Sequence, residues 1–102
     1  MKSEKRKSFV VTGVDYDEAF SKAVRAATEI GLSIFTSDKG SGTFYASRGV
    51  GYGELTEMNF FLEKGDKGEL TFIVRVKSSK GSENVINKFV AAYSKYVKIT
   101  GI

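Results

Sequence analysis

The stretch that decides the fold is Thr28–Gly49, TEIGLSIFTSDKGSGTFYASRG. It ends an amphipathic helix, because Gly31 readily takes the left-handed backbone conformation that follows a helix's last turn. Two runs rich in β-branched and aromatic residues come next, Leu32–Ser37 and Thr43–Arg48, with a turn-forming DKGSG between them. The stretch therefore predicts a helix that leads into an antiparallel pair of strands.

The helix upstream of this stretch begins at Asp15, a good N-cap residue, and Glu18 can complete a capping box. Its apolar residues recur at helical spacing and form one stripe: Ala19, Phe20, Ala23, Val24, Ala27 and Ile30. A strand at Ser8–Thr12 precedes it. Residues 1–7, rich in Lys and Arg, are expected to be a flexible basic arm.

Downstream, two more strands are predicted at Glu54–Lys64 and Glu69–Ser78, because the intervening Gly65–Gly68 segment is a strong hairpin signal. The glycine-rich residues 49–53 are expected to be a mobile connection. Ser82 is the expected cap of a last helix, and residues 100–102 are the expected tail. That helix has a broad apolar face: Val85, Ile86, Phe89, Val90, Tyr93 and Val97.

The element order is thus β-α-β-β-β-β-α, in a chain of 102 residues that has room for one hydrophobic core. Strands joined by short loops pair antiparallel. Each helix has one apolar face, so both should cover the same side of the sheet. We predict a single α+β domain over residues 8–99, a five-stranded antiparallel sheet with two helices packed on one face.

Strand alternation predicts which side chains face the helices. In Glu69–Ser78 one set of alternate positions is apolar throughout, so these residues must point inward together: Leu70, Phe72, Val74 and Val76. A slip of one residue would turn the strand inside out. The same alternation in the other strands, with the helical stripes, predicts this core: Phe9, Phe20, Val24, Ile30, Leu32, Ile34, Phe44, Phe60, Leu62, Phe72, Val74, Ile86, Phe89 and Val90.

One motif links the helix end to the strands after it. The helix ends with Ile30 and Gly31, and the alternating apolar residues Leu32 and Ile34 follow. The motif then continues with Asp38, Gly42 and the aromatic-x-alanine pair Phe44 and Ala46. This pattern resembles small domains of bacterial envelope lipoproteins, similar in style to the repeats of the C subunit of the β-barrel assembly machinery. The element order is also similar to one half of the TATA-binding protein, which implies the sheet order 1-5-4-3-2.

The lipoprotein resemblance implies a place in the periplasm or cell envelope and no catalytic residues. Such proteins attach to the membrane through a lipidated cysteine that follows a signal peptide, and this chain has neither. A membrane contact is therefore expected only through a lipid anchor absent from this chain, as in a trimmed mature domain. A cytoplasmic protein is the alternative.

The composition argues against catalysis and metal binding. His and Cys are both absent, so neither a Ser-His-Asp or Cys-His nucleophile nor a tetrahedral zinc site can form. The acidic groups at Asp15–Glu18 and along Glu54–Glu63 are interpreted as a capping cluster and a solvated face. Residues 49–53 precede a strand rather than a helix, which argues against a phosphate cradle. We expect no enzyme activity, no cofactor and no metal.

The opposite side of the sheet is unusually apolar. Val10 and Lys77 share its outward phase with Asn59 and the residues that we take as the candidate binding face: Phe35, Tyr45, Phe61, Ile73 and Arg75. A solvated sheet face normally alternates to polar residues, and a contiguous apolar patch marks a contact surface. The competing interpretation is that these are scattered exposed apolar residues, which are common.

Three functions follow from these features. The first is a non-enzymatic interaction module that binds a protein partner, or a second copy of itself, through the open sheet face. The second is a cytoplasmic single-stranded nucleic-acid-binding domain, which is disfavoured because Glu57 and Glu63 lie on the same face and the net charge is only +4. The third is a small-ligand or lipid carrier, which requires a cavity between the sheet and the helices.

Overall fold

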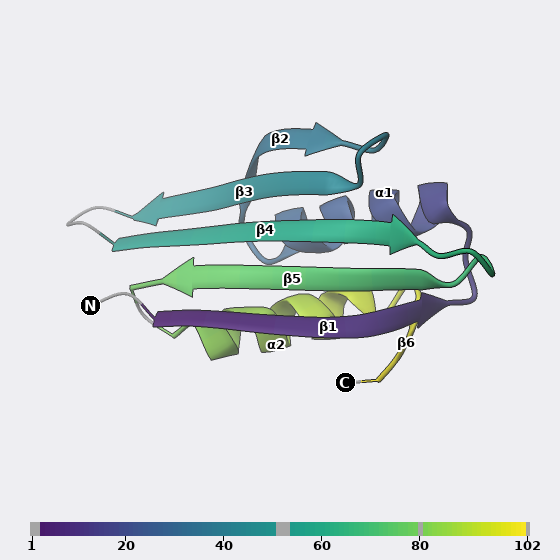
Figure 1. The fold of residues 1–102 in the computed structure, drawn as a ribbon. Coiled ribbons are helices and arrows are strands. Elements are labelled where there is room, and N and C mark those ends of the chain that lie inside the picture. Colours follow the sequence, from purple (N-terminus) through teal and green to yellow (C-terminus); the bar gives the residue numbers. More distant parts are fainter. Residues whose placement is uncertain (1–2, 51–53, 80, 102) are drawn as a thin grey trace.

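The computed structural model of the protein describes residues 3–50, 54–79 and 81–101. One antiparallel sheet has the strand order β2-β3-β4-β5-β1-β6, and Figure 1 shows both helices on the same side of it. The α+β class is confirmed. The elements in chain order are β1 (Ser3–Thr12), α1 (Tyr16–Glu29), β2 (Ser33–Asp38), β3 (Thr43–Val50), β4 (Glu54–Lys64), β5 (Leu70–Ser78), α2 (Ser82–Tyr93) and β6 (Lys98–Thr100).

The prediction of five strands was wrong, because the sheet has a sixth strand, β6. Val11 lies opposite Ile99, and Thr12 lies opposite Lys98. Residue 100, expected to begin the tail, is the last residue of this strand. Three residues are too few to show the alternation by which strands are recognised in a sequence. The remaining order, from β2 to β1, agrees with the order that the resemblance implied.

The prediction of a flexible arm was wrong for residues 3–7, which are the first half of β1. They continue the antiparallel ladder with β5, in which Ser3 lies opposite Ser78. The Ser3 hydroxyl also accepts a hydrogen bond of 3.0 Å from the backbone N–H of Ser82. The prediction of Ser82 as the helix cap was wrong. Ser82 is the first residue of α2, and the N-cap is Gly81, which has no side chain to bond the free amides.

Both ends of α1 lie where the sequence predicts them, with Asp15 as the N-cap and Gly31 just after the last turn. The Asp15 carboxylate accepts a hydrogen bond of 2.8 Å from the backbone N–H of Glu18. At the other end Gly31 has a φ of +92°, and the N–H of Leu32 donates to the carbonyl of Ala27 over 3.1 Å. This is a Schellman termination, which turns the chain directly into the edge strand β2.

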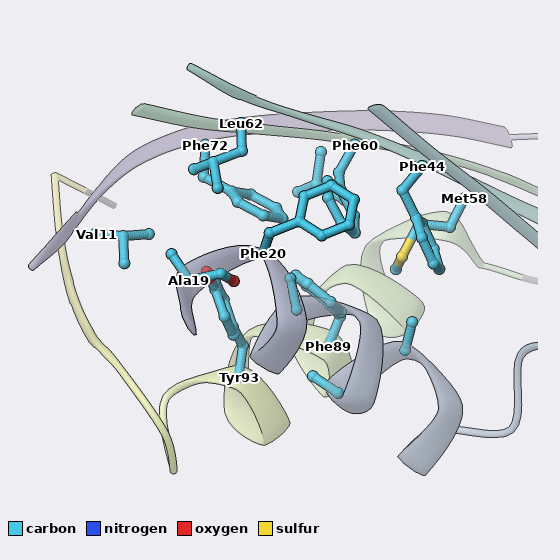
Figure 2. Close-up of a cluster of buried hydrophobic side chains, with 14 of the residues drawn as sticks. Val11, Ala19, Phe20, Phe44, Met58, Phe60, Leu62, Phe72, Phe89 and Tyr93 are labelled. Carbon is cyan, nitrogen blue, oxygen red and sulfur yellow. The ribbon is translucent and has the colours of Figure 1, made fainter. Parts of the chain in front are cut away.

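The core lies between the sheet and the two helices (Figure 2). A row of rings fills this space, with centroid distances of 4.5 Å between Phe44 and Phe60, 4.7 Å between Phe60 and Phe72, and 5.7 Å between Phe72 and Phe89. These side chains are at most 3% exposed, as strand alternation predicted for Phe44, Phe60 and Phe72 and the apolar helix face predicted for Phe89. Such close contacts are typical of a core packed at ordinary protein density.

Tyr93 joins the two helices through a hydrogen bond that sequence patterning did not reveal. Its hydroxyl donates to the backbone carbonyl of Ala19 over 2.7 Å, in the buried space between α2 and α1. Burial raises the pKa of the Tyr93 phenol well above its usual range. The side chain therefore stays neutral near neutral pH, and its hydroxyl keeps the proton that it donates in this bond.

The predicted core was wrong at Ile34, whose side chain is 44% exposed. Its register with Ala46 places it on the helix side, but β2 is the edge strand and all of its residues are exposed. Three other predicted core residues, Val24, Ile30 and Val90, are only partly buried and pack against the margin of the core. Alternation predicts the direction of a side chain but not how far the helices extend over it.

Candidate functional site

The side of the sheet away from the helices, here called the outer face, has no helix over it (Figure 1). Its side chains are arranged in rows across the strands by the ladder register. In one row Phe61 lies between Thr43 and Ile73. In the next row Asn59 lies between Tyr45 and Arg75. Four of the five predicted binding residues therefore occupy two adjacent rows.

The fifth, Phe35, reaches the outer face through a β-bulge. The register between β2 and β3 shifts between Ile34 and Thr36, which leaves Phe35 as an extra residue on the edge strand. Its ring packs edge-on against Tyr45, with centroids 5.6 Å apart, and its side chain is 74% exposed. The bulge thus extends the apolar surface of the outer face to the edge of the sheet.

Arg6 belongs to the outer face and was missed, because residues 1–7 were interpreted as a flexible arm. In the β1–β5 ladder Arg6 lies directly opposite Arg75, so it ends the row that contains Tyr45 and Asn59. Extending the alternation of Ser8 and Val10 two residues toward the N-terminus would have placed Arg6 on this face.

A depression of about 340 Å³ lies in the outer face over β1, β3, β4 and β5. Phe61, Ile73 and Arg75 are among the residues around it, while Phe35 and Tyr45 are not. Its polar groups are two guanidinium groups, an amide and a hydroxyl, next to apolar side chains. The full set is Arg6, Thr43, Phe44, Asn59, Phe60, Phe61, Ile73 and Arg75. A second depression of about 460 Å³ lies beside it, near Tyr16 and Phe61.

Around the depression, some charged side chains have a partner of opposite charge and others do not. Lys77 lies 4.0 Å from Glu4, and the Tyr45 hydroxyl donates to Glu57 over 2.7 Å, which raises the pKa of Tyr45. By contrast, no carboxylate in the described part of the chain lies within ion-pair distance of Arg6 or Arg75. Among the residues that the structure describes, these two cations at the depression therefore face each other with no anion between them.

This juxtaposition predicts that Arg6→Gln stabilises the domain. Like charges directly opposite each other on neighbouring strands are unfavourable, so the free energy of unfolding should rise by up to about 1 kcal/mol at low salt. Urea denaturation measures the change. At 1 M salt the gain should largely vanish, because the Debye length is then only about 3 Å. Lys88→Gln, at an exposed position on α2, is the charge control, and an equal gain there would contradict the explanation.

Comparison with known proteins adds information about the fold. No family model and no curated protein sequence matches the chain. The solved structure of Ara h 8.0201 is similar with a TM-score of 0.58 and 14% identity, over 94% of this chain and 98% of that one. DynU16, a putative protein in the dynemicin biosynthetic locus, is similar with a TM-score of 0.50 and 16% identity, over 91% of this chain and 46% of that one.

These identities are low, so the likeness shows that the α+β fold recurs in solved proteins and shows nothing about activity. Within the described residues, no three acidic side chains gather where they could hold a metal ion. The helices in the same part of the chain are too short or too polar to cross a membrane.

Proposed function

We propose that this domain is a non-enzymatic binding module that contacts a partner protein through the outer face. The observation that supports this most strongly is the pair of exposed rings, Phe35 at 74% and Phe61 at 39% exposure, on a face without a helix over it. Both rings have an apolar neighbour that is partly buried, since Tyr45 packs against Phe35 and Ile73 lies opposite Phe61. Aromatic side chains on an apolar surface are the usual anchors of protein interfaces.

Charge complementarity indicates the chemistry of the partner. In the described part of the chain, the cations of this face that lie outside ion-pair distance of every carboxylate are Arg6 and Arg75, next to the apolar Phe61 and Ile73. A partner surface that combines apolar side chains with an acidic side chain would match both features. A nucleic acid strand fits less well, because its phosphates repeat along the chain and would approach the carboxylates of the outer face.

A small ligand is the second candidate, and the depression of about 340 Å³ is the observation that favours it. That volume lies within the range of ligand sites in proteins, about 300–1,000 Å³. The space between the sheet and helices is filled by the rings of Phe44, Phe60, Phe72 and Phe89, so a carrier would bind its ligand on the outer face rather than in the core.

The envelope location rests on the lipoprotein resemblance of residues 30–46 and is part of this proposal. The start of the complete gene tests it. A signal peptide that ends in a lipobox cysteine upstream of Met1 would support an envelope lipoprotein, whereas a gene that starts at Met1 would contradict it.

The proposed contact surface is tested by selecting binders from a random peptide library displayed on phage. We expect the enriched peptides to bind the wild-type domain and to bind the double variant Phe35→Ser, Tyr45→Ser about tenfold more weakly or worse, because both rings are removed. Isothermal titration calorimetry measures the affinities. Ile34→Ser is the matched control, since Ile34 is an exposed apolar residue of the same strand on its other side.

Two results would overturn the proposal. One is equal binding of the peptides to the double variant and the wild type, when urea denaturation shows both to be folded. The other is a dimer of the wild-type domain in sedimentation velocity that the double variant does not form, because the occupant would then be a second copy of this chain.

A further inference from the structure

The strongest unassigned feature is the arginine pair at the depression. Directly opposite residues on antiparallel strands have Cα atoms about 4.5–5.5 Å apart, so the side chains of Arg6 and Arg75 leave the sheet side by side. Each guanidinium offers five N–H donors in a planar fork. Asn59, opposite Arg75 on the other side, adds an amide at the same depression. Three donor side chains thus border one hollow.

The pair is unfavourable in the free protein. Two like charges face each other across the ladder, and no described carboxylate lies between them. An anion placed there would remove the repulsion and accept charge-assisted hydrogen bonds from both forks. Since no described residue supplies such an anion, the domain is arranged to gain from one that a partner brings.

The surroundings limit that anion to one small group. Glu57 and Glu63 follow the outward phase of β4 on either side of Asn59 and Phe61, and Lys77 is already beside Glu4. A polyanion would have to pass these carboxylates, and a dianion would be repelled more strongly than a monoanion. Phe61 and Ile73 at the same depression favour an apolar group directly next to the charge.

We propose that Arg6 and Arg75 form a subsite for a single carboxylate, that of an Asp or Glu side chain of the partner protein, with an adjacent apolar group packed on Phe61 and Ile73. This inference rests on the proposed function, since it names the group that the outer face recognises. The arginine pair then acts as the determinant of specificity, and the rings of Phe35 and Tyr45 supply contact area beside it.

The subsite is tested with benzoate and its neutral isostere benzamide as probes, followed by two-dimensional ¹⁵N–¹H NMR at constant ionic strength. We expect benzoate to shift the Nε–Hε signals of Arg6 and Arg75 in a saturable way, together with the amides of β4 and β5 around the depression. Benzamide should shift them little. Arg75→Gln should weaken benzoate binding about tenfold or more, and Lys88→Gln, which removes the same charge on α2, should not.

Three results would overturn the subsite. The first is that benzoate and benzamide shift the arginine Nε–Hε signals equally. The second is that Arg75→Gln binds benzoate as tightly as the wild type. The third is that inorganic phosphate, followed by the same signals, binds more tightly than benzoate. The last result would assign the site to a phosphate group.

The selected peptides separate this inference from the proposed function. If they bind Arg75→Gln as tightly as the wild type but lose the Phe35→Ser, Tyr45→Ser variant, the outer face is the contact surface and the carboxylate subsite is wrong. If benzoate binds as expected but no selected peptide depends on Phe35 and Tyr45, the proposed function is wrong and the arginine pair serves a small acid instead.

Discussion

Replacing Phe72 with alanine is expected to lower the free energy of unfolding by about 3–5 kcal/mol. Phe72 is fully buried, and its ring lies 5.1 Å from that of Phe9, 4.7 Å from that of Phe60 and 5.2 Å from that of Tyr93. Removing it opens a cavity at the point where three strands and α2 meet. Urea denaturation followed by circular dichroism measures the loss, a large fraction of the stability of a small domain.

Phe35→Ala is the matched control for this prediction. The chemical change is the same, but the Phe35 side chain is 74% exposed. Its loss should change the free energy of unfolding by no more than about 0.5 kcal/mol. A loss at Phe72 as small as the change at Phe35 would show that the rings of the core are not packed as described.

Replacing Gly42 with alanine is the second change with a large expected effect. Gly42 has a φ of +74°, and an added Cβ would lie 2.1 Å from the backbone carbonyl oxygen of Leu62. A hydrogen bond holds Gly42 close to β4, because the backbone N–H of Leu62 in that strand donates to the Gly42 carbonyl over 2.8 Å. Backbone strain of this kind costs about 1–3 kcal/mol, and moving β4 away adds to it. We expect a loss of at least about 2 kcal/mol by urea denaturation.

Gly49→Ala provides the comparison. Gly49 lies in β3, and nothing lies within 4 Å of the position of an added Cβ. Alanine there should leave the stability unchanged or raise it slightly, because it restricts the unfolded chain more than glycine does. Equal losses at Gly42 and Gly49 would mean that the close approach to Leu62 is not what requires glycine.

Much of the fold follows from local signals in the sequence. Asp15 and Gly31 mark the ends of α1 because their side-chain chemistry and backbone freedom suit those positions. The alternation in β4 and β5 sets which face is buried, since one face must be apolar throughout. The outward direction of Phe61, Ile73 and Arg75 follows from the same alternation.

What could not be predicted depends on contacts between distant segments. The basic segment at residues 3–7 has no apolar periodicity, and it is a strand because β5 provides a partner for it. For that reason Arg6 was not recognised as a neighbour of Arg75. Likewise β6 exists only through its pairing with β1, and Ile34 is exposed because the helices do not cover the edge strand. The prediction of a mobile connection over residues 49–53 was wrong for Gly49 and Val50, which belong to β3, and residues 51–53 lie outside the described residues.

The most direct test of the central claim is to map the amide signals that shift when a selected peptide binds the wild-type domain. The account predicts that the shifts lie along β3, β4, β5 and β1, with the largest changes around Tyr45, Phe61 and Arg75. Shifts confined to α1 and α2, with those strands unchanged, would contradict the assignment of the outer face as the binding surface.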